Sequence, residues 1–253
     1  MTFDVAAESY ERFMGAWSTG LAPQLIAYAG VRPGQTVLDV GCGPGILTRP
    51  LVDLLGADHV VAVDPSPSFV AATADRFPGV RVAEAGAESL PLDDGEVDHA
   101  LAQLVVHFMT DPVAGLAEMA RVTRPGGVVA ASVWDHGGGR GPLSTFFEAV
   151  QSLDPDNPGE RDYAGVNAGH LGELLRAAGL GRVEETRHDV ERHYDDVDAW
   201  WAPYTLGVGP AGAYVAGLDD DGKEALLEAC RARLPRGPFT ATASAWVARG
   251  TVR

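Results

Sequence analysis

The fold is decided by the sequence VLDVGCGPG at residues 37–45. Its apolar start predicts a buried strand, and its glycines predict a tight turn. The following run over residues 46–55 predicts a helix. Glycines let a backbone pass close to a ligand, and a helix N-terminus offers free N–H groups. The next apolar run ends in Asp64, where an acid can accept both hydroxyls of a ribose. The pattern predicts a site for a nucleoside or nucleotide.

Seven segments carry strand patterns. Apolar or alternating runs occupy residues 36–40, 59–64, 80–85, 97–103, 127–134, 182–194 and 238–250. Helical patterns between the first five are typical of βαβ units around a parallel sheet. We therefore predict an α/β fold with a Rossmann-like, doubly wound sheet of seven strands.

We expect one domain over residues 1–253. It comprises N-terminal cap helices (1–35), a cofactor-binding half (36–135) and an acceptor-side half (136–253) with a helical insertion at about 195–222, between strands six and seven. Ser66 and Pro67 predict the start of a helix, and Gly56 the end of the preceding one. Pro50 conflicts mildly with that preceding helix and is a potential kink.

Composition excludes several classes of protein. The chain is 46% hydrophobic and 21% charged, as globular proteins are, and its net charge of -16 disfavours nucleic acid as a partner. Two cysteines imply no disulfide framework. The acidic N-terminus does not resemble a signal peptide, and no window has about 18 uncharged apolar residues. We expect a cytoplasmic protein that has no membrane partner.

The glycine spacing distinguishes two cofactor classes. A dinucleotide fingerprint reads G-x-G-x-x-G/A, but Ile46 occupies its third glycine position and the spacing here is G-x-G-x-G. Asp39 precedes the turn, where it would repel a phosphate and attract an ammonium group. S-adenosylmethionine carries an ammonium group and no phosphate, so it suits the turn better than a nicotinamide dinucleotide.

Four segments resemble class I SAM-dependent methyltransferases in their order and spacing. They are DVGCGPG (39–45), VAVDPS (61–66), AESLPL (87–92) with FMTDP (108–112), and RVTRPGG (121–127). The resemblance covers roughly residues 36–135, and AWWAPY (199–204) with AWVARG (245–250) resembles a bacterial small-molecule subgroup. It implies a sheet of seven strands whose last strand is antiparallel.

The resemblance also implies roles for individual residues. Asp39, Gly41 and Gly43 would hold the methionine part, with Cys42 as a small residue of the same turn, and Asp64 would hold the ribose. The adenine would lie near Pro65, Ser66, Ala87 and Glu88, and Gln103 would border the methionine and the sulfonium. Gly86 departs from the family, in which an aspartate often meets the adenine amino group, so either Glu88 replaces that aspartate or backbone alone holds the adenine edge.

An N-terminal helix closes over the cofactor in similar methyltransferases. Tyr10, Trp17 and Ser18 are therefore candidates for a lid over the cofactor. The alternative is a capping helix that packs Phe13, Met14 and Trp17 against the sheet.

Methyl transfer to a hydroxyl or ammonium group needs a base, and histidine is the usual choice near neutral pH. His107 and His136 follow the fourth and fifth strands, where the carboxyl ends should face the ligand, and Asp135 is a weaker candidate. Packing or surface positions are the alternative for both histidines. No cluster has metal-ligand spacing, so no metal is expected.

We predict a methyltransferase that moves a methyl group from S-adenosylmethionine to a small, partly apolar metabolite, with O-methylation favoured over N- and C-methylation. Aromatic residues of the insertion could roof the acceptor pocket or anchor the insertion to the core: Trp200, Trp201, Tyr204 and Tyr214. The alternatives are a SAM-binding sensor or non-catalytic subunit and, more remotely, an NAD-linked oxidoreductase. The sequence leaves the acceptor, the methylated atom and the oligomeric state open.

Overall fold

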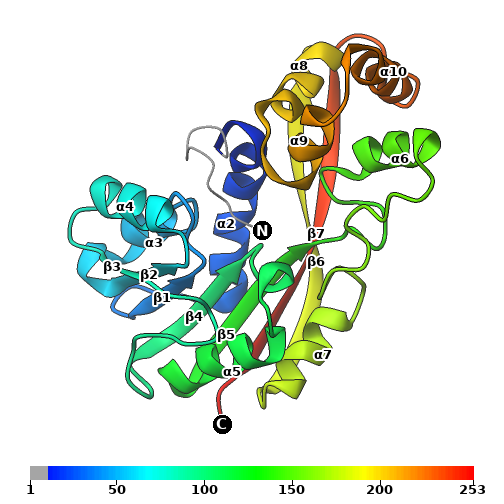
Figure 1. The fold of residues 1–253 in the computed structure, drawn as a ribbon. Helices are drawn as coiled ribbons and strands as arrows, with labels where there is room; N and C mark the ends of the chain where they lie inside the picture. The colour runs from blue at the N-terminus through cyan, green and yellow to red at the C-terminus, as the bar shows by residue number, and fades with distance from the viewer. Residues whose placement is uncertain (1–10) are drawn as a thin grey trace.

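The computed structural model describes residues 11–253, with side chains from Phe13 onward. In this part of the chain seven strands form one sheet in the order β3-β2-β1-β4-β5-β7-β6 (Figure 1). The strands are β1 (Val37–Val40), β2 (Val60–Asp64), β3 (Arg81–Glu84), β4 (Val97–Gln103), β5 (Thr123–Trp134), β6 (Gly181–Tyr194) and β7 (Phe239–Thr251). The first five are parallel and β7 is antiparallel to both its neighbours, as predicted.

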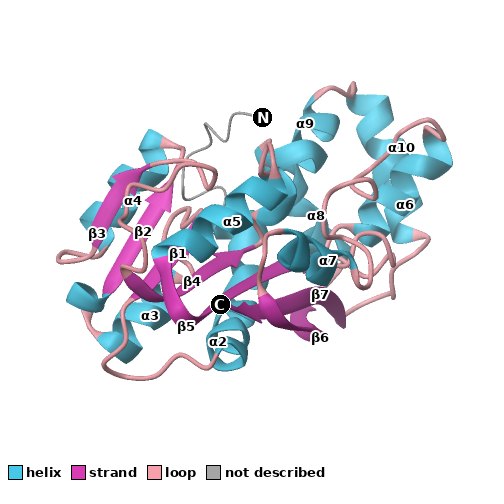
Figure 2. Ribbon diagram, turned by 90° about the horizontal axis from the view of Figure 1, so that it is seen from below, coloured by secondary structure: helices cyan, strands magenta, loops and turns pink. Residues whose placement is uncertain are grey.

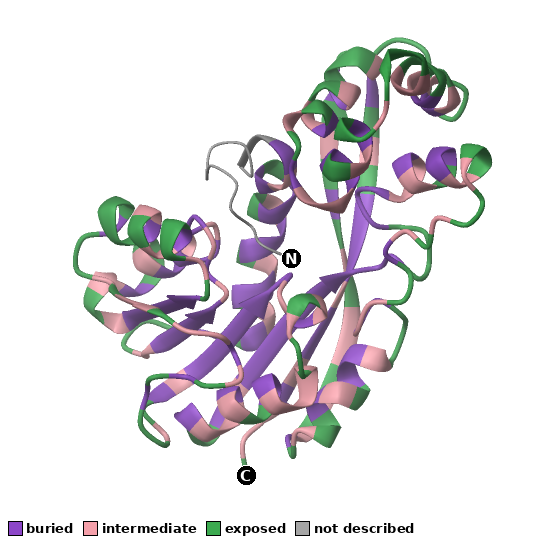
Figure 3. Cartoon of the chain, in the orientation of Figure 1, coloured by how far each residue is buried: buried purple, intermediate pink, exposed green. Residues whose placement is uncertain are grey.

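Helices cover both faces of the sheet. Helices α2 (Ala16–Ala29) and α3 (Thr48–Leu55) lie on one face, and α5 (Pro112–Val122) and α7 (His170–Ala177) lie on the other (Figure 2). Helix α4 (Pro67–Arg76) packs on β2 and β3. Because β1 and β2 are covered on both sides, all of their residues are buried (Figure 3), which explains their continuous apolar runs.

The remaining short elements complete the chain. They are η1 (Glu11–Gly15), η2 (Ala57–His59), η3 (Val106–Phe108), α6 (Ser144–Leu153), α8 (Val197–Trp201), η4 (Ala202–Leu206), α9 (Gly209–Ala216) and α10 (Asp220–Arg231). Helices α6, α8, α9 and α10 gather beyond one end of the sheet (Figure 1).

A two-stranded ribbon carries these outer helices. Strand β5 pairs with β7 only as far as Trp134 opposite Ala245, whereas β6 and β7 stay paired up to Tyr194 opposite Phe239. The last part of β6 and the first part of β7 therefore project past the carboxyl ends of the parallel strands. The predicted insertion leaves from Tyr194, so it lies above the edge where a ligand would bind.

Aromatic packing holds the insertion in place. The Tyr204 ring stacks on Phe146 of α6, with centroids 4.6 Å apart and planes 8° apart, and Trp200 and Trp201 contact Tyr204. Tyr204 and Trp200 are buried. These contacts match the anchoring alternative for the aromatic residues of the insertion.

Most predicted element bounds agree with the structure to within one or two residues, but β5 begins four residues earlier than predicted, at Thr123. The mild conflict at Pro50 has a local explanation. Helix α3 begins at Thr48, so Pro50 lies in the first turn. Backbone N–H groups have no intrahelical partner there, and a proline removes nothing that the helix needs.

The turn after β1 requires glycine for two different reasons. Gly41 and Gly43 both have positive φ values, +70° and +52°. A β-carbon on Gly41 would lie 2.5 Å from Cγ2 of Val105, whereas a β-carbon on Gly43 would meet nothing within 4 Å. Gly41 thus allows close packing of the turn on the chain after β4, and Gly43 leaves open space beside the backbone.

This difference predicts unequal costs for two matched substitutions. Gly43→Ala adds mainly backbone strain, about 1–2 kcal/mol. Gly41→Ala adds the clash with Val105 to a similar strain, and overpacking costs about 1–3 kcal/mol more. Chemical denaturation of both variants should show Gly41→Ala as the less stable, and equal stabilities would contradict the packing role of Gly41.

Candidate functional site

Asp39 is buried at the carboxyl end of the sheet, beside the glycine turn. Its Oδ2 accepts a hydrogen bond of 2.6 Å from the hydroxyl of Thr48, at the start of α3. Burial raises the pKa of Asp39 to about 7, against the lowering effect of the Thr48 hydrogen bond. A buried carboxylate with one partner is costly, so a cationic group placed here would be stabilised.

Asp64 ends β2 and binds two backbone N–H groups. Its Oδ2 accepts from Gly43 and its Oδ1 from Ser66, both at 2.9 Å. Burial raises its pKa, and the two hydrogen bonds lower it. A carboxylate offers about four lone-pair positions, so each oxygen can still accept from a ribose hydroxyl.

Gln103 ends β4 and has an unsatisfied polar atom. Its Nε2 donates to the backbone oxygen of Ser18 at 3.0 Å, which links β4 to α2. Its Oε1 is buried and has no partner. Buried polar atoms are rarely left unpaired in proteins, so this oxygen fits a bound ligand that donates a hydrogen bond.

The residues expected near the adenine are less uniform. Pro65 is exposed, and Ser66 is half-buried with its hydroxyl 2.9 Å from that of Ser68. Ala87 packs into the core. Glu88 uses Oε1 to accept from the backbone N–H groups of Thr110 and Asp111, at 2.8 and 3.2 Å. Glu88 therefore holds the start of the next loop and has Oε2 left for an adenine edge.

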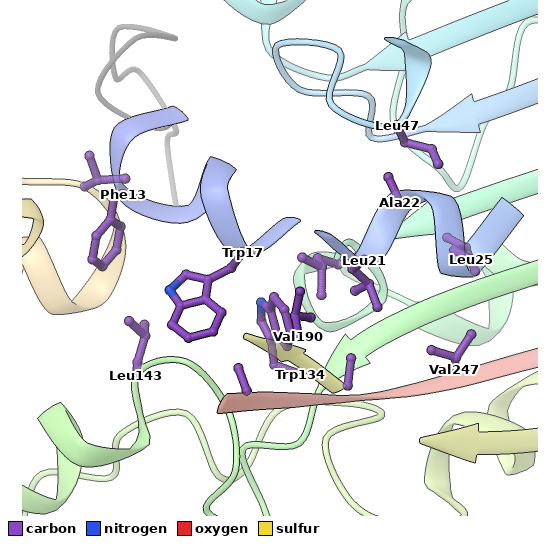
Figure 4. Close-up of a cluster of buried hydrophobic side chains, with 14 of the residues drawn as sticks. Phe13, Trp17, Leu21, Ala22, Leu25, Leu47, Trp134, Leu143, Val190 and Val247 are labelled. Carbon is purple, nitrogen blue, oxygen red and sulfur yellow. The ribbon is translucent and has the colours of Figure 1, made fainter. Parts of the chain in front are cut away.

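Predicted site residues of the glycine turn and of the N-terminal helix have buried side chains. The Cys42 side chain is buried, with its Sγ 4.0 Å from the hydroxyl of Thr73, so it points into the protein. Trp17 points into the same buried cluster as Phe13 and Trp134 (Figure 4). Ser18 is buried and its hydroxyl donates to the backbone of Met14. This packing matches the capping-helix alternative, and Tyr10 lies outside the described residues.

A cavity of about 50 Å³ opens next to these residues. Its walls come from the start of the N-terminal helices, from the ends of β4 and β5, from the segments that flank α6, and from the insertion: Phe13, Met14, Leu104, His107, Phe108, Trp134, His136, Leu143, Glu160, Val208, Gly209 and Pro210. A cavity needs at least about 10–15 Å³ of such space to hold one water molecule, so this one can admit the reacting end of a small molecule. Among these walls, polar atoms without partners are Nδ1 of His107, Nε1 of Trp134 and Oε2 of Glu160.

The structure brings both predicted histidines to this cavity. Their ring centroids are 6.2 Å apart, and His107 stacks on Tyr163 at 5.9 Å. Burial lowers the pKa of His107 to about 3 and that of His136 to about 4. Both imidazoles are therefore uncharged at neutral pH. Asp135, the weaker candidate, accepts from Gly138 and Arg140 and so holds the loop after β5.

Sequence reasoning missed several residues of the cavity. Glu160 lies in the segment between α6 and α7, which carries no periodic pattern. From the insertion, the residues that line the cavity are Val208 to Pro210 and not the aromatic residues that were candidates for its roof. Leu104 directly follows Gln103 and has a φ of +62°, rare for leucine. Such strain occurs often at functional sites, but only the structure reveals it.

Comparisons with known proteins agree with this geometry. Residues 38–131 match the methyltransferase domain family. The malonyl-[acyl-carrier protein] O-methyltransferase of Serratia marcescens is 32% identical over 152 residues, which cover 60% of this chain and 57% of that protein. The chain thus spans little more than half the length of this curated relative, and less of some others.

Solved structures share the fold at low identity. A SAM-dependent methyltransferase from Thermotoga maritima has a TM-score of 0.57 and 20% identity, and the match covers 97% of this chain and 96% of that one. Phosphoethanolamine N-methyltransferase 2 of Haemonchus contortus, solved with S-adenosyl-L-methionine, has a TM-score of 0.60 and 18% identity, over 98% of this chain and 57% of that one.

A Rossmann-like sheet with a glycine turn and a terminal acid at its carboxyl edge is the arrangement by which many proteins bind a nucleoside cofactor. Residues 38–131 thus match a methyltransferase domain, and over almost its full length the chain shares the Rossmann-like fold of solved SAM-dependent methyltransferases.

The described residues form neither a metal cluster nor a membrane-spanning helix. Within residues 11–253, no three His, Cys, Asp or Glu side chains are grouped so as to hold a metal ion. None of the described helices has the length and apolar character required to span a membrane.

Asp39→Asn should change stability in a pH-dependent way. Because the pKa of Asp39 is raised from 3.8 to about 7, the folded protein retains this proton at pH 5, and stability is lost as pH rises towards 7. Asparagine carries no charge, so the gain in melting temperature over the unchanged chain should be larger at pH 8 than at pH 5.

The same variant should bind S-adenosylhomocysteine more weakly by calorimetry, because it lacks the charge that suits an ammonium group. Asp53→Asn, on the exposed side of α3, is the control. An equal change in melting temperature at both pH values would contradict the buried charge.

Proposed function

We propose that this chain is a methyltransferase that moves a methyl group from S-adenosylmethionine to a small, partly apolar metabolite, with O-methylation favoured. The observation that carries the proposal is the continuity of two sites. Gln103 borders the cofactor edge, and the next residue, Leu104, begins an apolar cavity that holds two uncharged histidines.

We further propose how the chain holds the cofactor. Asp39 and the backbone of Gly41 to Gly43 bind the methionine part, and Asp64 binds the ribose. Gln103 Oε1, buried without a partner, accepts from the ammonium group. Ser66 and Glu88 lie on the adenine side.

When bound, S-adenosylmethionine supplies a methyl carbon on a positively charged sulfur, so the acceptor oxygen forms the new C–O bond and the C–S electron pair stays on sulfur. The residues of the chain orient the acceptor and exclude water. His136 or His107 takes the acceptor's proton, which is possible because both imidazoles are neutral near pH 7.

The partner we propose is a small-molecule acceptor, with neither nucleic acid nor a membrane involved, and the proposed location is the cytoplasm. Two observations support this reading. The net charge is -16, and both cysteines are buried free thiols, as in a reducing compartment. O-methylation is also the activity named for the Serratia marcescens relative.

Calorimetry with S-adenosylhomocysteine tests the cofactor site. Asp64→Ala should weaken binding by about 1–3 kcal/mol, or roughly 5- to 150-fold, because ribose hydroxyls lose their acceptor. Asp53→Ala is the matched control. Unchanged affinity in Asp64→Ala would remove Asp64 from the site.

A screen for methyl transfer tests the reaction. With an acceptor in hand, His107→Gln combined with His136→Gln should lower turnover about 100-fold or more. If the double variant keeps full turnover, neither histidine is the base. Cofactor binding without transfer to any acceptor would favour a non-catalytic SAM-binding protein.

A further inference from the structure

Glu160 is a buried acid that the cofactor site does not use. Its side chain is 5% exposed, and its Oε2 lies 3.4 Å from Nδ1 of His136, which is equally buried. The same Oε2 has no hydrogen-bond partner. Burial of an acid is costly unless the acid is paired, and Glu160 lies at a cavity wall, not in the middle of the core.

Resting on the proposed function, we propose that Glu160 positions His136 as the base that removes the proton from an uncharged hydroxyl group of the acceptor. A carboxylate 3.4 Å from Nδ1 favours the tautomer that carries its proton on that nitrogen. The other nitrogen, Nε2, is then the one free to accept a proton. When it does, the carboxylate stabilises the charged imidazolium.

The walls of the cavity favour an uncharged acceptor. Glu160 is the only residue with a formally charged side chain among the described residues that line it, and the other walls are largely apolar. A carboxylate acceptor would meet the acid Glu160 and no cationic side chain among the described residues that line the cavity. A carboxylate is also already ionised at neutral pH, so it needs no base.

For a hydroxyl acceptor, the cavity provides both a hydrogen-bond donor and a base. Its oxygen can accept from the N–H of Trp134, a buried donor without a partner, while its proton passes to Nε2 of His136. The oxygen is then free to form the bond to the methyl carbon, and the proton returns to solvent from His136 after the product leaves.

Other charged and titratable groups surround the pair. Asp135 precedes His136 and raises its pKa against the lowering by burial, and His107 lies across the cavity with Tyr163 behind it. Glu148 and Arg161 line a smaller pocket on the other side of His136 and Glu160. Of these acids, Glu160 has a raised pKa of about 7. Proton loss from Glu160 near neutral pH would therefore make His136 a stronger base.

Nuclear magnetic resonance of the full chain with S-adenosylhomocysteine tests the coupling without an acceptor. With histidine labelled in the ring, the His136 signals should shift with a midpoint near pH 7 as Glu160 loses its proton. This response should vanish in Glu160→Gln and persist in Glu148→Gln, the matched control. A His136 response that is absent, or that is the same in Glu160→Gln, overturns the pairing.

Turnover tests the acceptor class. Phenols and aliphatic alcohols are compared with benzoates and benzylamines of matched ring substitution. The cofactor is kept at a saturating concentration, so that cofactor binding at Asp39 does not limit the rate. Methylation of a hydroxyl compound is expected. Methylation of benzoates or benzylamines alone, or of none of the compounds by a chain that binds S-adenosylhomocysteine, overturns the hydroxyl assignment.

On the hydroxyl compound that is methylated fastest, Glu160→Gln should lower kcat about 10-fold or more and leave KM within about 3-fold of its original value. A general base contributes roughly 10²–10⁴-fold to the rate, and the loss of its positioning residue should remove a part of that. The rise in kcat near pH 7 should be lost in Glu160→Gln and kept in Glu160→Asp and Glu148→Gln. An unchanged kcat and pH profile would overturn the role of Glu160, whereas failure to bind S-adenosylhomocysteine would instead overturn the proposed function.

Discussion

The glycine turn is attached to the neighbouring strand by hydrogen bonds, and the site depends on this attachment. The N–H groups of Gly41 and Cys42 donate to the backbone oxygen of Val63, and the N–H of Gly43 donates to Asp64 Oδ2. Asp64 thus accepts a hydrogen bond from the turn and can still accept another from a ligand. Because β1 and β2 are parallel neighbours, their ends meet at one edge, and the turn cannot move without breaking bonds to β2.

Four polar side chains are buried at this edge at a cost in free energy. Asp39, Gln103, His107 and Glu160 each carry a shifted pKa or an atom without a partner. Large apolar clusters on both faces of the sheet stabilise the fold sufficiently to tolerate these groups. The unsatisfied atoms lie at the carboxyl edge of the sheet or beside the cavity, where a bound molecule can satisfy them.

The local sequence pattern was sufficient to predict much of the fold. The buried strands read as continuous apolar runs because both faces are covered, and the glycine turn carries its own signal because positive φ favours glycine. The predicted bounds of β4 agree with the structure, and the early start of β5 was missed because its first residues, from Thr123 to Gly127, contain a proline and glycines.

The sequence by itself determined the fold class, the glycine turn with Asp39 and Asp64, and the positions of the two histidines after β4 and β5. Each of these depends on residues close together in the chain. Only the tertiary structure decided that Glu160 meets His136, that Gln103 holds Ser18, and that the insertion contributes Val208 to the cavity while Tyr204 anchors it. The physical reason is that these contacts join segments far apart in sequence, and the paired ribbon of β6 and β7 sets where the insertion lies.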